Sequence, residues 1–193
     1  MSKKITLPPI KYNSPVMITF ALVSFIALIL NFITTGESNK LLFSVYRSSL
    51  RDILFYPRLF LHVLGHADIT HYMNNFMIVL LVGPMLEEKY GSKRMIMMIV
   101  FTAFITGLIF VIFFPQNALL GASGVVFMMI LLSSFANAGK KEIPLTLILV
   151  TLLYIGTEII NGLFSADNVS QLAHIIGGTC GGVFGFLIAN KKM

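Results

Sequence analysis

The sequence predicts an all-α membrane protein in which six transmembrane helices form one bundle, with an interfacial segment between the first and second helices. The composition is the first indication: 56% of the 193 residues are hydrophobic, only 11% are charged, and the mean hydropathy is +0.87. A soluble domain carries about a quarter charged residues. The second indication is the distribution of charge, because no charged residue occurs between Arg94 and Lys140.

The uncharged stretch after Arg94 is too long for one membrane crossing, and the sequence Pro115-Gln116-Asn117 divides it into two helices. Each of the other predicted helices coincides with one apolar run of about the 17–25 residues that a crossing needs. We expect one membrane domain over residues 1–193, with helices at 16–35, 69–86, 95–114, 122–138, 144–163 and 171–190.

The first apolar run, from Val16 to Thr35, follows the basic start MSKKITLPPIKYNS, which lacks a small-residue cleavage site. The run is also long for a signal peptide, so we interpret it as a retained membrane anchor. The single cysteine, Cys180, excludes a disulfide within the chain and a multi-cysteine metal site. Its neighbours Thr179 and Gly181 indicate that it packs as a small apolar residue.

The basic residues predict the orientation in the membrane, because lysine and arginine gather on the cytoplasmic side. With the N-terminus inside, ten of the fourteen basic residues are cytoplasmic: Lys3, Lys4, Lys11, Lys89, Lys93, Arg94, Lys140, Lys141, Lys191 and Lys192. The net charge of +6 is therefore spread between apolar segments and does not indicate a nucleic-acid partner. We expect a multi-pass protein with both termini in the cytoplasm, in a bacterial plasma membrane.

The predicted external segment 36–68 holds the remaining basic residues, which are Lys40, Arg47, Arg51 and Arg58. It contains the runs LLFSVY, DILF and RLFLHVL, which are too apolar for a free linker and too short to span. An amphipathic structure lying in the outer membrane interface fits this composition.

Unusual polar side chains occur where the second, fourth and sixth predicted helices begin, at the outer face. These openings read HADITHYMNN from His66, GASG from Gly121 and QLAH from Gln171. Polar groups inside membrane helices face the protein interior or a water-filled cavity. Three separate segments therefore place histidine and asparagine side chains, a serine and a further histidine at similar depths.

Acyl transfer is the chemistry that such a set allows. The Ser123 hydroxyl becomes a nucleophile when a base removes its proton, and His174 is suited to that task near neutral pH. No carboxylate lies beside His174 in its own helix, and Asp167 belongs to the preceding loop. We therefore predict a Ser–His dyad rather than a triad.

The same segments could stabilise a developing oxyanion. A serine at a helix start lies beside unpaired backbone N–H groups and the positive end of the helix dipole. Gly121 and Gly124 would allow a close approach of backbone and substrate. His71 and Asn75 are four residues apart, so they share one helix face and can donate to one oxygen.

Each of these residues also has a structural interpretation. Ser123 could be a small residue at a helix contact, and His174 a histidine satisfied within the core. His71 and Asn75 could form hydrogen bonds between helices. The coincidence of all four at one depth favours a functional site over these separate structural roles.

Metal binding is the competing chemistry, since His62, His66 and His71 follow one another closely and Asp68 adds a carboxylate. However, the sequence contains no HExxH motif and has only four histidines. We therefore expect no metal and no other cofactor.

The motifs GASG, AHIIGGTCGG and HADITHYMNN together resemble those of the rhomboid family of intramembrane serine proteases. The resemblance covers residues 16–190 and predicts the minimal six-helix form of that fold. Arg58 is similar to the arginine of the family's tryptophan–arginine loop motif. Glu87 is similar to an acidic residue at the end of the family's second helix.

The resemblance implies that Ser123 is the nucleophile and His174 the general base and acid. It also implies that His71, Asn75 and the Ser123 amide form the oxyanion hole. Supporting roles are implied for His66, Gly121, Gly124, Phe127, Gly177 and Gly181. Together with Gly185, the last two glycines are spaced by four residues and would let the sixth helix pack closely on the fourth.

Two positions depart from the family pattern. Phe127 stands where the family often has a tyrosine, and phenylalanine can stack on the base but cannot hydrogen-bond to it. Pro57 replaces the tryptophan before Arg58. Glu158, in the fifth predicted helix, has no assigned chemistry: it could line the substrate entrance or a water cavity, but we expect it to hold that helix to a neighbour.

The resemblance implies an endopeptidase that cleaves transmembrane segments of single-pass proteins near the external membrane face. Its expected partners are these substrates and membrane lipid. One alternative is a proteolytically inactive relative that binds transmembrane helices. A channel or transporter subunit is another, but the inner halves of the polar helices are apolar and offer no continuous path.

Overall fold

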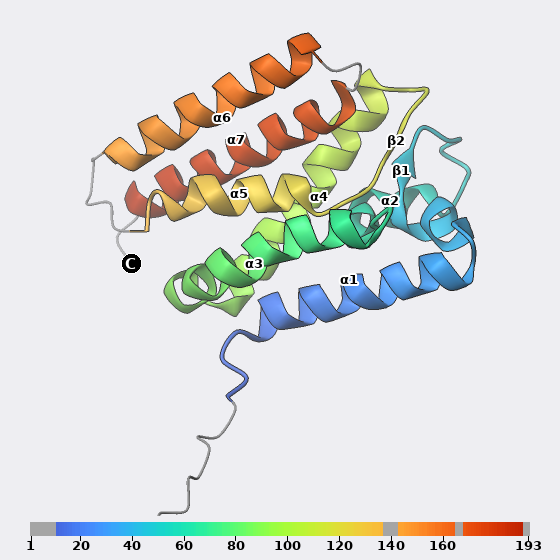
Figure 1. The fold of residues 1–193 in the computed structure, drawn as a ribbon, viewed down its shortest axis with the longest axis horizontal. Coiled ribbons are helices and arrows are strands. Elements are labelled where there is room, and N and C mark those ends of the chain that lie inside the picture. Colours follow the sequence, from blue (N-terminus) through green and yellow to red (C-terminus); the bar gives the residue numbers. More distant parts are fainter. Residues whose placement is uncertain (1–10, 137–142, 165–167, 191–193) are drawn as a thin grey trace, which may run out of the picture.

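The computed structural model describes residues 11–136, 143–164 and 168–190; the side chains of residues 154, 155, 157–164, 168–170 and 190 lie outside the described part. The described chain is mostly helical (Figure 1). Its long helices are α1 Pro15–Ile33, α3 Ile69–Tyr90, α4 Ser92–Phe113, α5 Ser123–Ser133, α6 Leu145–Phe164 and α7 Asn168–Asn190.

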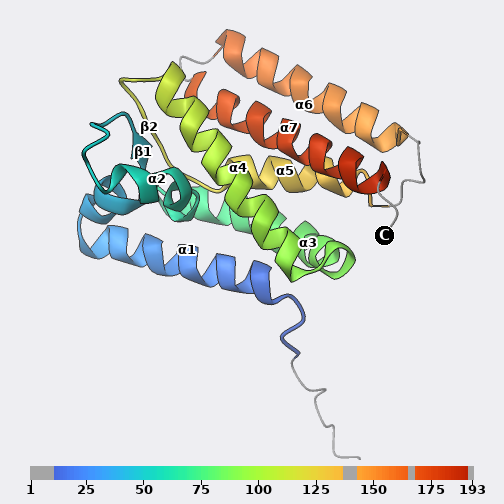
Figure 2. The ribbon, with the colours of Figure 1, turned by 180° about the vertical axis from the view of Figure 1, so that it is seen from behind.

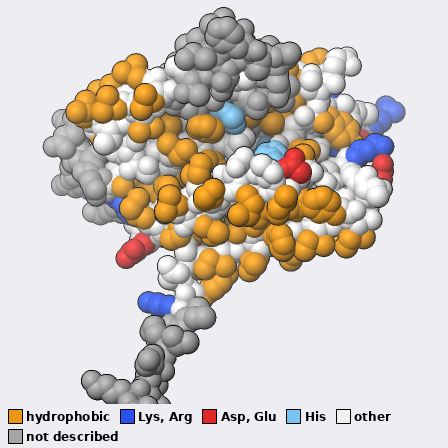
Figure 3. All heavy atoms as spheres, in the orientation of Figure 1, with side chains coloured by type: hydrophobic (Ala, Val, Ile, Leu, Met, Phe, Trp, Pro, Cys, Tyr) orange, Lys and Arg blue, Asp and Glu red, His pale blue; other side chains and the backbone are white. Residues whose placement is uncertain are grey.

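Among the residues that the structure describes fully, four stretches are long and apolar enough to cross a membrane: Pro15–Ile33, Ile69–Tyr90, Ser92–Phe113 and Gln171–Ala189. Figure 3 shows hydrophobic side chains along the length of the molecule, while the visible charged side chains lie towards its two ends. Helix α5 has 11 residues, whereas an unaided crossing needs about 20. A membrane protein follows from the four long helices, and the count of six spans stays a prediction.

Two predicted helix ends are wrong. Helix α3 continues past residue 86 to Tyr90, because the carboxylate of Glu87 is buried and hydrogen-bonded instead of ending the helix in solvent. Helix α5 stops at Ser133 instead of residue 138. The backbone changes there to hydrogen bonds between residues three apart, with Ser134 N–H donating to Leu131 O over 3.3 Å. The Ser133 hydroxyl also donates to Ile130 O over 2.7 Å.

The segment between α1 and α3 contains four short elements. They are the π-helix η1 Asn39–Phe43, the strand β1 Val45–Tyr46, the helix α2 Phe55–Leu61 and the 3₁₀ turn η2 His62–Leu64. Strand β1 pairs antiparallel with β2 Ala118–Leu119, and Val45 lies opposite Leu119. This pairing ties the segment to the chain that leads into α5.

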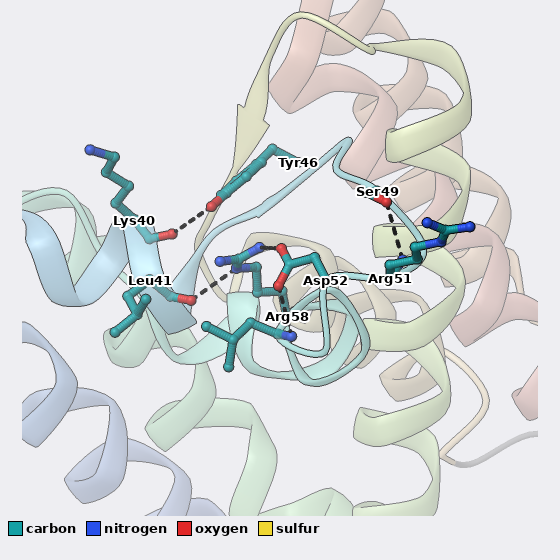
Figure 4. A network of polar contacts seen from close by, with 8 residues as sticks. Lys40, Leu41, Tyr46, Ser49, Arg51, Asp52 and Arg58 are labelled. Carbon is teal, nitrogen blue, oxygen red and sulfur yellow. Dashed lines mark hydrogen bonds and ion pairs between the residues drawn. The ribbon is translucent and has the colours of Figure 1, made fainter.

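Arg58 is buried within this segment, with only 4% of the residue exposed, and contacts several parts of it (Figure 4). Its Nη1 donates to Asp52 Oδ2 over 2.7 Å, its Nε donates to Leu41 O over 2.9 Å, and its Cζ lies 4.5 Å from the centre of the Tyr46 ring. The hydrogen bond from the Leu54 amide lowers the pKa of Asp52, and Arg58 lowers it further. The resemblance singled out Arg58, but it did not predict these partners.

In Figure 1 the helices lie in the order α6, α7, α5, α3 and α1, with α4 crossing obliquely, as the reverse view in Figure 2 also shows. Among the described helices, α5 and α7 make the most extensive contact. Close approach is possible because Gly177 lies against the backbone of Gly124, and Gly181 lies against the backbone of Met128. Helix α5 is thus held between α3 and α7.

Candidate active site

A cavity of about 520 Å³ lies where α3, α5 and α7 meet. The chain segment that leads into α5 forms another part of its wall, through Ala118, Leu119 and Leu120. Its side chains with hydrogen-bonding groups are His71, Asn74, Asn75, Ser123 and His174. The residues predicted for the nucleophile, the base and the oxyanion hole therefore line one cavity.

Ser123 is the first residue of α5, and the backbone before it is fixed at several points. The Gly121 N–H donates to His62 O over 2.9 Å, and Leu119 belongs to the strand pair. No side chain caps the N-terminus of α5. Its first amides and the positive end of its dipole are therefore directed towards the cavity in which Ser123 lies.

Gly121 brings the α3 side chains close to the serine turn. Its φ of +120° belongs to a region that side-chain-bearing residues rarely adopt. A Cβ added there would lie 2.7 Å from Nε2 of His71 and 3.9 Å from Nδ2 of Asn75. Both nitrogens therefore approach the same stretch of backbone, two residues before Ser123.

The start of α3 fixes His71 and Asn75. Asp68 is the N-cap of the helix, and its Oδ1 accepts the His71 N–H over 2.8 Å. One turn later, Asn75 Nδ2 donates to His71 O over 3.1 Å. Asp68 thus acts as a helix cap in the structure, a role that the metal hypothesis did not consider.

His66, for which a supporting role is implied, is completely buried and is not among the residues that line the cavity. Its Nδ1 lies 3.1 Å from Leu64 O, and the Ala122 N–H donates to its Nε2 over 3.4 Å. Both contacts suit one neutral tautomer, with the proton on Nδ1. Burial lowers the pKa of His66 to about 4, which keeps it in this neutral form.

His174 enters the cavity from α7. It is held there because α5 and α7 pack closely. A Cβ added to Gly124 on α5 would lie 3.2 Å from the carbonyl oxygen of Ala173, the residue before His174 on α7. Gly124 and Ala173, which adjoin Ser123 and His174 in the sequence, therefore lie close together. The ring of Phe127, one turn after Ser123, lies 4.3 Å from the His174 ring at an interplanar angle of 38°. The two rings are thus in contact but tilted, rather than stacked in parallel as the sequence allowed.

The histidines considered for a metal are used otherwise. His62 is buried, and its Nε2 lies 3.0 Å from Ala103 O. Burial lowers the pKa of His62 to about 4. Within residues 11–136, 143–164 and 168–190, no three His, Cys, Asp or Glu side chains form a group that could hold a metal ion. Asp167 and the side chain of Glu158 lie outside the described residues.

A family model for the Rhomboid domain matches residues 55–191, which is most of the chain. This chain belongs to the rhomboid family. The match confirms the resemblance of its three motifs. The rhomboid sequence is also 26% identical to RHOMBOID-like protein 4 from Arabidopsis thaliana over 130 residues, which are 64% of this chain. The aligned region spans 32% of that plant protein, so this rhomboid chain corresponds to about a third of its length.

Sequence reasoning missed three contributors to this rhomboid cavity. Asn74 lines it, although only its neighbour Asn75 was assigned a role. The carbonyl of His62 and the strand residue Val45 hold the segment before Ser123. The motif HADITHYMNN contained a signal for Asn74, whereas a backbone carbonyl and a two-residue strand leave no recognisable pattern in one sequence.

Proposed function

We propose that this rhomboid is an intramembrane serine endopeptidase in which Ser123 is the nucleophile and His174 the general base. The observation that supports this proposal best is the cavity itself. It brings Ser123 and His174 from two helices to one wall, next to His71 and Asn75. Side chains that only joined helices together would not need to line an open cavity.

The reaction follows from this arrangement. His174 takes the proton of the Ser123 hydroxyl as the oxygen attacks a peptide carbonyl, giving a tetrahedral oxyanion. His71 Nε2, Asn75 Nδ2 and the Ser123 amide donate hydrogen bonds to that oxyanion. His174 then returns the proton to the leaving amine, and water hydrolyses the acyl-enzyme by the same steps in reverse order.

The proposed substrates are single-pass membrane proteins cleaved near the external face, with both termini of the protease in the cytoplasm. A transmembrane helix hides its carbonyl groups in its own hydrogen bonds, so it must unwind before attack. Glycine or proline near the scissile bond would ease this unwinding. The half-buried position of Ser123 is compatible with access by both substrate and water.

Cleavage of a reporter with one transmembrane segment, measured in proteoliposomes, tests the proposal. Ser123→Ala should reduce the rate by at least about 10³-fold, since the nucleophile is lost. Ser133→Ala is a matched control in the same helix, because Ser133 is outside the cavity and its hydroxyl bonds to Ile130 O. Equal cleavage by wild type and Ser123→Ala would overturn the assignment.

The same assay separates the proposed protease from a relative that only binds transmembrane helices. Such a binder would retain the intact reporter on affinity purification, equally well in wild type and Ser123→Ala. A protease would release cut product from the wild type and retain intact reporter only in the variant.

A further inference from the structure

Two adjoining cavities, separate from the one at Ser123, lie along the N-terminal part of α1. The first is an apolar groove of about 480 Å³ between α1 and α4. Its walls run from Pro15 to Val23 on α1 and from Ser92 to Val100 on α4. Figure 2 shows α4 running obliquely to α1 on this side of the molecule.

The groove has the depth of one membrane leaflet. Eight residues separate Pro15 from Val23, which corresponds to ~12 Å of helix, and half of the hydrocarbon core is ~15 Å. Leu64 also lines the groove. Because the turn η2 reaches α4 at Ala103, one turn beyond Val100, Leu64 lies at the end of the groove that is farther from Pro15 and Ser92.

The mouth of the groove adjoins a polar pocket of about 630 Å³. Pro15 and Ser92 line both cavities, so a ligand at this point can extend into each. The pocket is lined by one basic and two acidic side chains, which are Lys11, Glu87 and Glu88. A headgroup that carries both signs of charge matches this lining better than an anionic one.

The carboxylate of Glu87 is already engaged in hydrogen bonds within the protein. It accepts hydrogen bonds from the hydroxyls of Ser14 and Ser92, over 2.5 and 2.6 Å, and from the amides of Val16 and Met17. Glu88, in contrast, is exposed and forms no ion pair with another described residue.

Lys11 is likewise exposed and without an ion pair within the described part of the chain. The pocket therefore offers one cation and one carboxylate that are not engaged with each other. These are the groups that can bind a phosphate and an ammonium, respectively.

We propose that this pair of cavities binds one phospholipid of the cytoplasmic leaflet with a zwitterionic headgroup that contains a primary amine, as in phosphatidylethanolamine. One acyl chain lies in the groove between α1 and α4. The phosphate pairs with Lys11, and the ammonium donates hydrogen bonds to Glu88. A choline headgroup has no N–H to donate, and a glycerol headgroup has no positive charge for Glu88.

Native mass spectrometry of the detergent-purified protein tests this site, with dioleoyl phosphatidylethanolamine, phosphatidylglycerol and phosphatidylcholine added in equal amounts. The wild type should retain one phosphatidylethanolamine about fivefold more than either competitor, the ratio that one exposed ion pair supplies. Equal retention of the three lipids, a preference for phosphatidylglycerol, or a protein dimer in place of bound lipid would overturn the proposal.

Variants then locate the lipid. Ile96→Trp fills the groove and should lower lipid retention by more than about tenfold, because buried methylenes are lost. Met97→Trp is the matched control, since Met97 is exposed on the same helix but does not line the groove. Val23→Trp fills the groove from α1 and serves if Ile96→Trp does not fold. The same retention in groove and control variants would contradict the site.

Glu88→Gln addresses the headgroup. It should leave total lipid retention within about twofold while removing the preference for phosphatidylethanolamine over phosphatidylcholine. Glu37→Gln, at an exposed carboxylate beyond the other end of α1, should keep the preference. A preference that survives Glu88→Gln would overturn the headgroup assignment.

Discussion

Two polar clusters lie at opposite ends of this helical bundle, and they differ in how their hydrogen bonds are satisfied. At the Glu87 cluster, one buried carboxylate accepts from two hydroxyls and two amides and so joins the starts of α1 and α4 to the end of α3. At the Ser123 cavity, polar side chains from several segments line an open space of about 520 Å³. In the first cluster the carboxylate is engaged by groups of the protein, whereas in the second the polar side chains border a cavity.

The two clusters compensate the cost of their polar groups in different ways. Polar residues are costly in the membrane, and the protein can compensate the cost by internal partners or by access to water. Substitutions in the Glu87 cluster should therefore reduce stability, and substitutions around Ser123 should reduce activity.

The largest effect is expected at the contact between α5 and α7, the helices that carry Ser123 and His174. A side chain at Gly177 would overlap the Gly124 backbone, whereas one at Gly182, on the same helix, would meet nothing within 4 Å. Gly177→Val should lose activity and at least about 3 kcal/mol of stability, the upper end for overpacking. Gly182→Val should leave both nearly unchanged. Thermal unfolding in detergent and reporter cleavage check the pair, and equal behaviour of the two variants would refute the close contact.

Asn75→Ala should lower the cleavage rate by about 10²–10³-fold, as expected when one oxyanion donor is removed. Its stability should change little, because the Asn75 side chain donates to a carbonyl of its own helix, His71 O. The measurements are kcat for the reporter and the unfolding midpoint. A large loss of stability with unchanged kcat would place Asn75 in the structural class instead.

Glu87→Ala should have the opposite pattern. Removing the carboxylate leaves buried donors on α1 and α4 without an acceptor, which costs about 1–3 kcal/mol. Fully folded Glu87→Ala protein should cleave the reporter within about threefold of the wild-type rate, because no part of the cavity has been removed. Glu37→Ala is the control, since that carboxylate is exposed and lies outside the Glu87 cluster. If Glu87→Ala abolished cleavage without lowering the unfolding midpoint, the division between the clusters would fail.

The smallest effect concerns pH. Burial lowers the pKa of His66 to about 4, below the value of 6.5 in an unfolded chain. The unfolded chain therefore binds more protons than the folded protein between these pH values. The free energy of unfolding should fall as the pH drops from about 6.5 towards 4. Between pH 6.5 and pH 5.5, this histidine should account for a loss of about 1 kcal/mol. His62 has a similarly lowered pKa and adds to the slope. His66→Gln should accordingly weaken the pH dependence of the unfolding midpoint by about half; an unchanged slope would contradict a buried neutral His66.

The sequence predicted the elements whose signal is local. Apolar runs located the helices that form α1, α3, α4, α6 and α7 to within about one turn, because hydropathy depends on each residue by itself. The predicted end of α3 at residue 86 was too early, since one sequence does not reveal that Ser14 and Ser92 enclose Glu87.

The residues of the candidate site could also be predicted from the sequence, but the contacts that hold them in place could not. Ser123, His174, His71 and Asn75 were recognised by motif and depth. The pairing of Val45 with Leu119 was not recognised, because strands of two residues carry too little pattern and their partners are far apart in sequence. The burial of His66 was missed for a related reason, since its contact with Ala122 joins two segments only in the folded chain.

The central claim is that the Ser123 hydroxyl is activated by His174. A fluorophosphonate probe, followed by mass spectrometry of the labelled peptide, measures this directly because it needs no knowledge of the natural substrate. We predict one adduct on Ser123 in the wild type, and loss of that adduct in His174→Ala protein that unfolds at the wild-type temperature. An adduct on another residue, or undiminished labelling of Ser123 without His174, would contradict the claim.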